Sequence, residues 1–344
     1  MRKKSKVTIR DIAAALNISP ATVSRALNPD KTDIVDVDKV RLIKSKAREM
    51  NFSPNLSAAA LRTNKTNIIG VAIPDLLNVI FPPLIKGIQN YLEKHGKTAI
   101  LINTDNDPEK ALKGVNSLIL RKVDGLILAS AFMEDKSVME VLKHEIPCVL
   151  VARSIAKGHL VHQVLNDEMF GMELAINYLM SLGHTHLAHL EGPQNILQGK
   201  NRQEYFKLLC AKNNLKYDNV SCTGTNADYF SMASGQDLMN QYLSESGKAT
   251  AVIASNDLMA IGAMKAARTK NIEIPAQMSI MGINNMPYSE LVSPALTTIA
   301  IPHLLLGEHA AHMLLNEIEA PFEKKQRFMI SPDLVIRESC APPT

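Results

Sequence analysis

The sequence predicts an α/β protein in which a small all-α module precedes a two-lobed body with parallel sheets. Three observations lead to this fold class. Two short, capped amphipathic helices are encoded in residues 8–27, and basic side chains are concentrated in the same part of the chain. From Ile68 onward, short apolar runs alternate with helix-length segments, which is typical of βαβ units.

The first two predicted helices each have a start signal. Thr8 precedes an apolar run at helical spacing and Asp11 follows three residues later, which is the pattern of a capping box. Ser19 is placed as the N-cap of the second helix, and Pro20 as its first residue, where the missing N–H costs nothing. Asn28-Pro29 ends that helix. The inward apolar side chains are Ile9, Ile12, Ala13 and Leu16 in the first helix and Val23, Ala26 and Leu27 in the second.

The outward face of the second helix predicts DNA binding. Ala21, Thr22, Ser24 and Arg25 are slim or carry hydrogen-bond donors, as a helix that enters the major groove requires. Residues 1–65 hold 14 Lys or Arg and 6 Asp or Glu, a net charge of +8, so the rest of the chain sums to −4 within the total of +4. This is the charge distribution of a phosphate-binding module on a mildly acidic body. Two ordinary amphipathic helices are the alternative.

Residues 37–50 predict a third helix, which closes a small core with Val40, Ile43, Ala47 and Met50. After Pro54, residues 55–62 form a short alanine-rich helical pattern. Such a helix is marginal alone in water and needs a partner to pack against. A plain flexible linker is the alternative for this segment.

Seven apolar runs predict the strands of the body. Two halves of about 120 residues, each binding ligand at the carboxyl ends of its strands, make a two-lobed clamshell. No apolar run reaches membrane-spanning length, and the basic N-terminus leads into a capped helix rather than a signal peptide. The four cysteines lack paired spacing and suit a reducing cytoplasm. The predicted strands are Ile68–Ile73, Thr98–Ile102, Gly125–Leu128, Cys148–Val151, His186–Leu190, Val252–Ala254 and Met278–Gly282.

Val7 to Ala13 and the run Thr22-Val-Ser-Arg25 closely resemble the DNA-binding headpiece of the LacI/GalR (lactose repressor) family. The resemblance continues through residues 51–61 to Val335. It implies a helix-turn-helix domain at 1–54, a hinge helix and linker at 55–67, and a periplasmic-binding-protein-like effector-binding and dimerisation domain at 68–340. It also implies that the chain crosses between the lobes near 165, 295 and 323. The N-lobe would then hold residues 68–165 and 295–323, and the C-lobe residues 166–294 and 324–340.

The same resemblance implies two sets of site residues. In the hinge, Leu61 would wedge between base pairs in the minor groove, and Ala58 would contact the partner's hinge helix. In the body, the alternatives to effector contact are that Phe81 and Phe230 are plain core residues and that Arg202 is a surface residue. The implied DNA contacts are Thr8, Pro20, Ala21, Thr22, Ser24, Arg25, Asn28, Asn55, Ala58 and Leu61, and the implied effector contacts are Asn78, Phe81, Arg153, Arg202, Phe230, Asn256, Asp257 and Asn284.

Two departures from the family pattern bear on the ligand. Sugar-binding members usually have aspartate where this chain has Asn284 and Ala152. A carboxylate accepts hydrogen bonds from sugar hydroxyls, whereas an asparagine offers one acceptor oxygen and two donors. The loss of two acids beside Arg202 and Arg153 favours an anionic ligand such as a sugar acid or sugar phosphate. A less polar ligand, or none, is the alternative.

The predicted function is a cytoplasmic, nucleoid-associated bacterial transcriptional regulator, a repressor by its resemblance. Its expected partners are pseudo-palindromic double-stranded operator DNA, a small-molecule effector (sugar, sugar acid or sugar phosphate) and a second copy in a homodimer, or further copies in a tetramer. No membrane partner is expected. A solute-binding receptor, and a regulator that has lost its effector response, are the alternatives.

The sequence shows no nucleophile elbow and no phosphate-binding Gly-rich loop, so we expect no enzyme activity, no catalytic residue and no cofactor. His184, His186 and His189 are spaced along a predicted strand that would turn His189 to the opposite face, so no metal site is expected. His303, His309 and His312 are predicted to be surface or dimer-face residues of a late helix.

Overall fold

The structure, a computed structural model, describes residues 7–27, 34–52, 65–221, 230–245 and 247–344. The predicted DNA contacts Asn28, Asn55, Ala58 and Leu61 lie outside the described residues. The chain divides into two compact units, Met1–Thr66 and Asn67–Thr344, and each is described by itself.

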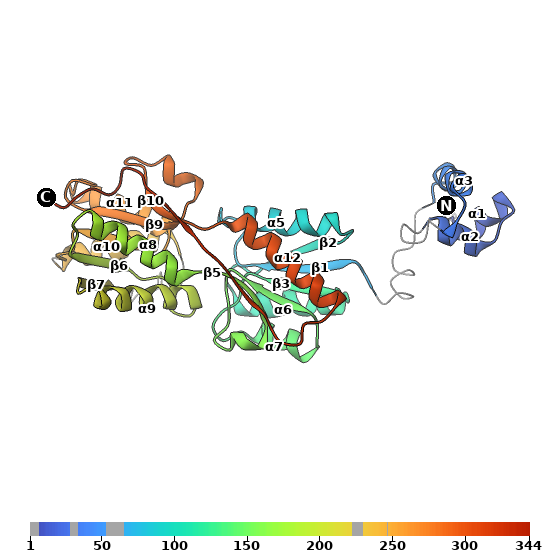
Figure 1. Cartoon of the computed structure of the whole chain (residues 1–344), viewed down its shortest axis with the longest axis horizontal. Coiled ribbons are helices and arrows are strands. Elements are labelled where there is room, and N and C mark those ends of the chain that lie inside the picture. The colour runs from blue at the N-terminus through green and yellow to red at the C-terminus, as the bar shows by residue number, and fades with distance from the viewer. Residues whose placement is uncertain (1–6, 28–33, 53–64, 222–229, 246) are drawn as a thin grey trace, which may run out of the picture. The chain divides into compact units, whose positions relative to one another are not determined.

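Three helices of the first unit pack around one small core (Figure 1). Their buried side chains repeat at helical spacing, which is why each helix has one inward face. The helices are α1 (Ile9–Leu16), α2 (Pro20–Ala26) and α3 (Val37–Glu49). The core consists of Ile12, Ala13, Val23, Ala26, Ile43 and Ala47.

Side-chain caps fix where α1 and α2 begin. The Thr8 hydroxyl accepts from the Asp11 N–H (3.4 Å), and the Asp11 carboxylate accepts from the Thr8 N–H (2.7 Å), so the predicted capping box is confirmed. Ser19 Oγ accepts from the Thr22 N–H (3.1 Å), with Pro20 as the first helical residue. Asn17 ends α1 in the left-handed conformation (φ 53°), which asparagine tolerates.

The described residues of the second unit form two six-stranded sheets, in the orders β11-β5-β4-β3-β1-β2 and β12-β10-β9-β8-β6-β7. Neighbouring strands are parallel except β10 and β12. We call the first sheet with its helices the N-lobe and the second the C-lobe. The strands are β1 (Ile68–Ile73), β2 (Thr98–Asn103), β3 (Gly125–Leu128), β4 (Cys148–Val151), β5 (His162–Asn166), β6 (His186–Leu190), β7 (Lys216–Val220), β8 (Ala251–Ala254), β9 (Ser279–Asn284), β10 (Thr297–Ala300), β11 (Arg327–Ile330) and β12 (Asp333–Val335).

Helices cover both faces of each sheet (Figure 1). In the N-lobe these are α5 (Phe81–Lys94) and α12 (His303–Glu319) on one face, and α6 (Pro108–Leu120) and α7 (Lys136–Lys143) on the other. In the C-lobe they are α8 (Glu168–Ser181) and α9 (Leu197–Lys212), opposite α10 (Met232–Ser244) and α11 (Asp257–Thr269). Short 3₁₀ turns, η2 (Gly158–Leu160) and η3 (Pro287–Glu290), complete the fold.

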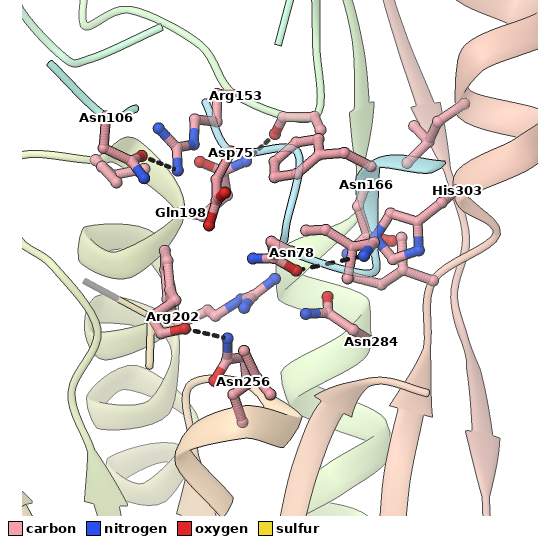
Figure 2. Close-up of a pocket in the computed structure, with 18 of the residues that line it drawn as sticks. Asp75, Asn78, Asn106, Arg153, Asn166, Gln198, Arg202, Asn256, Asn284 and His303 are labelled. Carbon is pink, nitrogen blue, oxygen red and sulfur yellow. Dashed lines mark hydrogen bonds between the residues drawn. The ribbon is translucent and has the colours of Figure 1, made fainter. Parts of the chain in front are cut away.

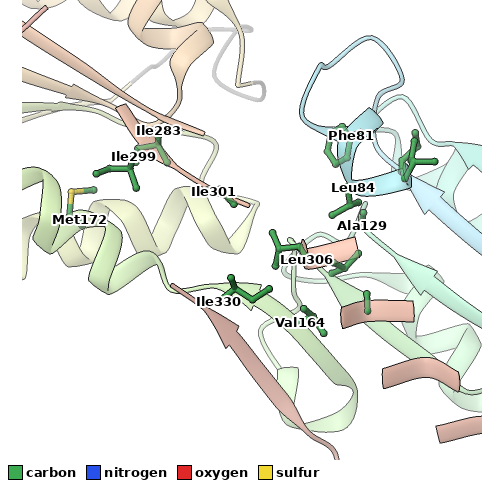
Figure 3. Close-up of a cluster of buried hydrophobic side chains, with 14 of the residues drawn as sticks. Phe81, Leu84, Ala129, Val164, Met172, Ile283, Ile299, Ile301, Leu306 and Ile330 are labelled. Carbon is green, nitrogen blue, oxygen red and sulfur yellow. The ribbon is translucent and has the colours of Figure 1, made fainter. Parts of the chain in front are cut away.

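One buried apolar cluster continues through both lobes (Figure 3). It includes Phe81 and Leu306 in the N-lobe and Ile283 in the C-lobe. Within the N-lobe, α5 and α12 approach so closely that a Cβ at Gly307 would overlap the Leu84 carbonyl oxygen. This close packing sets the first residues of α5 and α12 beside the point where the lobes meet.

The chain passes between the lobes after β5, β10 and β11. The first passage lies where the sequence placed it, near 165, but the others lie later than the predicted 295 and 323. Residues 297–300 pair with β9 and so belong to the C-lobe, and residues 327–330 pair with β5 and so belong to the N-lobe. The lobe boundaries are corrected accordingly, because strand pairing decides the lobe and the apolar run of β11, Phe328 to Ile330, is too short to have been predicted as a strand. Among the described residues, no helix is long and apolar enough to span a membrane.

Candidate functional site

The first candidate site is the exposed side of α2. Val23 and Ala26 are buried and anchor the helix on its core, while Ala21 and Arg25 are exposed. Thr22 and Ser24 are half-buried, and the Thr22 hydroxyl shares a hydrogen bond with Ser19 Oγ (2.9 Å). Arg25 has no ion pair with any described residue. A slim helix with an exposed guanidinium can enter a groove and contact phosphates or base edges.

The second candidate site is a cavity of about 310 Å³ in the second unit, where strands of both sheets end (Figure 2). Parallel strands deliver their carboxyl ends to the same edge of a sheet, which is where open α/β folds bind ligands. Seven of the eight predicted effector contacts line this cavity: Asn78, Phe81, Arg153, Arg202, Phe230, Asn256 and Asn284. Residues that were not predicted as effector contacts also line it, among them Asp75, Asn106, Asn166, Glu168, Gln198, Ser231, Ile301 and His303.

Asp257, the eighth prediction, is outside the cavity lining. It is fully buried as the first residue of α11, and its carboxylate accepts from the Met286 N–H (2.7 Å) and the Ser289 hydroxyl (2.8 Å). The Thr298 hydroxyl donates to its other oxygen (2.5 Å). Burial raises the pKa of Asp257, and these hydrogen bonds oppose that shift. The prediction is corrected because this side chain ties the loop after β9 to α11.

Arg202 on α9 lines the C-lobe side of the cavity with its charge already compensated. It is 4% exposed, and its Nε and Nη2 donate to the two oxygens of Glu168 at 2.7 and 3.0 Å. Its Nη1 donates to the carbonyl oxygen of Ser255. Three of the five guanidinium N–H groups are therefore used within the protein. The alternative of a surface arginine is wrong, and the argument that Arg202 brings uncompensated positive charge does not hold.

Arg153 follows β4 and lines the N-lobe side. It is 8% exposed, and its Nη2 donates to Asn106 Oδ1 (2.9 Å), as Figure 2 shows. Its Nη1 is buried without any hydrogen-bond partner. Burial lowers the pKa of Arg153 to about 10, so the group is still cationic at neutral pH.

Amide side chains make up much of the remaining polar lining. Asn256 caps α11 by accepting from the Met259 N–H (2.8 Å), so its oxygen is committed to the fold. Gln198 donates to the Ala152 carbonyl across the lobes, but its Oε1 is buried without a partner. Both amide atoms of Asn166 are also buried and unpartnered. Buried polar atoms are nearly always hydrogen-bonded, so these atoms indicate where a ligand supplies the missing donors and acceptors.

Three relatives align with almost the whole chain. The chain is 31% identical to the ribose operon repressor of Halalkalibacterium halodurans, over 96% of each chain. It is 31% identical to the HTH-type transcriptional regulator DegA of Bacillus subtilis (98% of this chain, 99% of the relative) and 32% identical to the HTH-type transcriptional repressor PurR of Klebsiella pneumoniae (97% of each). The chain belongs to the LacI/GalR family.

Comparisons of structure agree with this family. Residues 176–340 match the periplasmic binding protein-like domain family. The fold is similar to that of the Lac repressor dimer bound to operator and the anti-inducer ONPF, with a TM-score of 0.85 at 23% identity, covering 98% of this chain and 100% of that one. It is also similar to a LacI family transcriptional regulator from Enterococcus faecium with bound ribose (TM-score 0.69, 29% identity, 80% and 100% coverage).

His303 is a cavity residue of this LacI/GalR protein that the sequence analysis placed on the surface. It is the first residue of α12 and lines the cavity, where burial and then the positive charge of Arg202 lower its pKa to about 4. His309 stacks on Phe328 (centroids 4.4 Å apart). The surface assignment of His303 is wrong because this residue, at the first turn of α12, is half-buried and faces the cavity that long-range packing forms.

The three histidines of the second half of the chain that resembled a metal motif have separate protein partners. His184 Nδ1 hydrogen-bonds to Thr250 (2.7 Å), His186 pairs with Asp218 (2.9 Å), and His189 stacks on Phe206 (5.1 Å). Across the described residues, no group of three or more His, Cys, Asp or Glu is placed to hold a metal ion.

Three of the cavity residues that sequence reasoning missed share one signal. Asp75, Asn106 and Asn166 stand at or just after the carboxyl ends of β1, β2 and β5. The rule that ligands bind at the carboxyl ends of parallel strands could have indicated Asp75 and Asn106 beside Asn78, which the family resemblance supplied. It could not indicate Asn166, because the half-polar β5 was not predicted as a strand. Glu168 and Gln198 carried no local signal, since their roles come from contacts with Arg202 and Ala152.

Proposed function

We propose that this LacI/GalR-family protein is a transcriptional repressor that binds operator DNA through α2 and is controlled by a small polar molecule in the cavity between its lobes. One observation carries the proposal: a helix-turn-helix with an exposed arginine shares a chain with a cavity whose buried polar atoms lack partners. Neither a solute-binding receptor nor an enzyme accounts for the first of these two features.

DNA binding would use α2 as the recognition helix. Arg25 and Thr22 would contact bases and backbone, and Pro20 and Ala21 would face the groove. Ser24 and Thr8, the N-cap of α1, would contact phosphates. One short helix reads few base pairs, so we propose a homodimer on a pseudo-palindromic operator, as in the similar Lac repressor dimer with operator. Asn28, Asn55, Ala58 and Leu61 remain predicted contacts. Such a regulator works at the chromosome, in the cytoplasm and at the nucleoid.

Effector binding would use the cavity as a polar site with aromatic walls. Phe81 and Phe230 offer apolar surface, while Asn78, Asn166 and Asn284 offer donors and acceptors. The names of two similar proteins, a ribose operon repressor and a regulator solved with ribose, support a sugar or sugar derivative as the effector class. Asp257 is not part of this proposal.

The test is a DNA-binding measurement on the full chain. A duplex is selected from a random library with the protein, and its Kd is measured by fluorescence anisotropy for the wild type and for Arg25→Ala. We expect Arg25→Ala to weaken binding by about tenfold or more, because a good base contact is worth about 1–3 kcal/mol. Selection of no duplex by the wild type would contradict the proposal.

A control shows that the loss is local. Arg268 on α11 is an arginine of the second unit whose Nη2 donates to the Ser293 carbonyl (2.7 Å). Arg268→Ala is expected to leave the Kd for the selected duplex unchanged. Equal losses in the two variants would mean that α2 has no special part in DNA binding.

A further inference from the structure

The Arg153 guanidinium is a buried cation that forms no ion pair with any described residue. Its hydrogen bond to Asn106 comes from a neutral amide, and Nη1 has none. No described Asp or Glu forms an ion pair with it. Buried charges in proteins are nearly always paired, because an isolated ion loses several kcal/mol of solvation.

Two acids near the cavity, Asp135 and Glu168, have protein partners of their own, and the third, Asp75, forms no ion pair with Arg153. Both oxygens of Asp135 accept hydrogen bonds at the start of α7, so it acts on Arg153 only through its distant field. Glu168 is bound by Arg202. Asp75 lies in the same part of the cavity as Arg153 (Figure 2), and its Oδ1 accepts from the Leu77 N–H (2.9 Å).

Unpartnered amide atoms stand beside this cation. Arg153 lies two residues beyond the end of β4, Asn166 is the last residue of the neighbouring strand β5, and both side chains line the cavity. Gln198 donates to the carbonyl of Ala152, the residue before Arg153. The unpartnered atoms of Asn166 and Gln198 add two acceptors and one donor to the free Nη1.

We propose that the ligand of this cavity is a small hydroxylated metabolite with a carboxylate or phosphate group, which Arg153 binds through Nη1 while Asn166 and Gln198 bind its hydroxyls. The proposal rests on the proposed function and narrows the class of effector. It assigns the anion contact to Arg153 on the opposite wall rather than to Arg202, whose charge Glu168 already neutralises. A carboxylate or phosphate oxygen would give the buried guanidinium the charge-assisted hydrogen bond it lacks.

Ala152 provides a variant that supplies the counter-charge internally. It lines the cavity and has φ 60°, a left-handed conformation that aspartate tolerates better than alanine. Ala152→Asp therefore places a carboxylate in the cavity wall next to Arg153 without straining the backbone. We expect this variant to fold, to melt at a higher temperature than the wild type without ligand, and to lose its affinity for anions.

The experiment is thermal unfolding of the full chain at constant ionic strength with three probes: inorganic phosphate, ribose 5-phosphate and ribose. Phosphate and ribose 5-phosphate are expected to raise the wild-type Tm in a saturable way, because both bind the folded state. Arg153→Gln and Ala152→Asp should each weaken both probes by about tenfold or more. Arg268→Gln, which removes an exposed arginine of the same unit outside the cavity, is the matched control and should keep the wild-type response.

The ribose probe distinguishes recognition of the anionic group from recognition of the sugar. A ribose shift as large as that of ribose 5-phosphate in the wild type would overturn the proposal, as would no saturable shift with either anion or equal shifts in the wild type and Ala152→Asp. If Arg153→Gln does not fold, Ala152→Asp still decides the outcome. None of these measurements includes DNA, so their failure leaves the proposed repressor function standing, and a failed duplex selection leaves the ligand class standing.

Discussion

Polar side chains are arranged in opposite ways in the helix pair α1 and α2 and in the cavity. In the first unit, the polar groups of α1 and α2 are exposed and bond to neighbours three residues away, as in Thr8 with Asp11 and Ser19 with Thr22. In the second unit, polar side chains from distant parts of the chain are buried together, and several lack partners. An extended, charged partner such as DNA needs a preformed surface, whereas a small ligand supplies the hydrogen-bond partners that the buried polar groups of its site lack.

The comparison first predicts different responses to salt. Exposed phosphate contacts release counterions, so about six or more such contacts lower DNA affinity by about 10³-fold or more between 50 and 200 mM salt. Ligand binding in the cavity should change far less, because buried charges are weakly screened. Anisotropy with DNA and calorimetry with ligand, both over this salt range, test the contrast. Equal salt slopes would contradict it.

Breaking the buried ion pair should cost the most stability. Arg202→Ala leaves Glu168 buried without its partner and should lower the unfolding free energy by about 3 kcal/mol or more. Urea denaturation of the full chain, with the unfolding of each unit followed by hydrogen exchange of its own peptides, measures the loss in each variant. The matched control is Arg41→Ala, which breaks the exposed Arg41–Asp38 pair on α3 and should leave the stability nearly unchanged. Similar losses in both variants would mean that burial does not separate the two regions.

Acid should destabilise the second unit through its buried histidines. Burial and then the nearby charge of Arg202 lower the pKa of His189 to about 3, from an ordinary value of 6.5. Below 6.5 the unfolded chain binds a proton there and the folded chain does not, so stability falls as the pH drops from about 7 to 5. His189→Gln should flatten this slope but not abolish it, because His303 also has a lowered pKa and contributes part of it. A slope in His189→Gln that is as steep as in the wild type, or steeper, would contradict the assignment.

The smallest expected effect is local to α1. Thr8→Ala removes one half of the capping box and should destabilise the helix by about 1 kcal/mol. Hydrogen exchange of a peptide from residues 7–27 should then become faster, with the second unit unaffected. Thr8→Ser keeps the hydroxyl and should exchange like the wild type. Protection that is unchanged in Thr8→Ala would show that the core of α1, and not its cap, fixes its start.

What the sequence could predict follows the same division. The caps at Thr8 and Ser19 depend on residues within four positions, so they were predictable, as were the apolar strands β1, β3, β4 and β6. The polar edge strand β7 and the late strand β11, whose apolar run is only three residues long, were missed. The pairing of Arg202 with Glu168, and the position of His303 in the cavity wall, arise from packing between segments far apart in the chain. These long-range contacts decide the charge of the cavity, which explains why its ligand class needed the structure.

The central claim is that a ligand in the cavity controls the affinity of the helix pair for DNA. The most direct test titrates the selected duplex into the full chain with and without a ligand that raises its Tm, and repeats the titration with Asn166→Leu. We predict that the ligand changes the DNA Kd by about tenfold, a coupling of about 1.4 kcal/mol, and that Asn166→Leu loses this change while keeping the ligand-free Kd. An identical Kd with and without saturating ligand in the wild type would contradict the account.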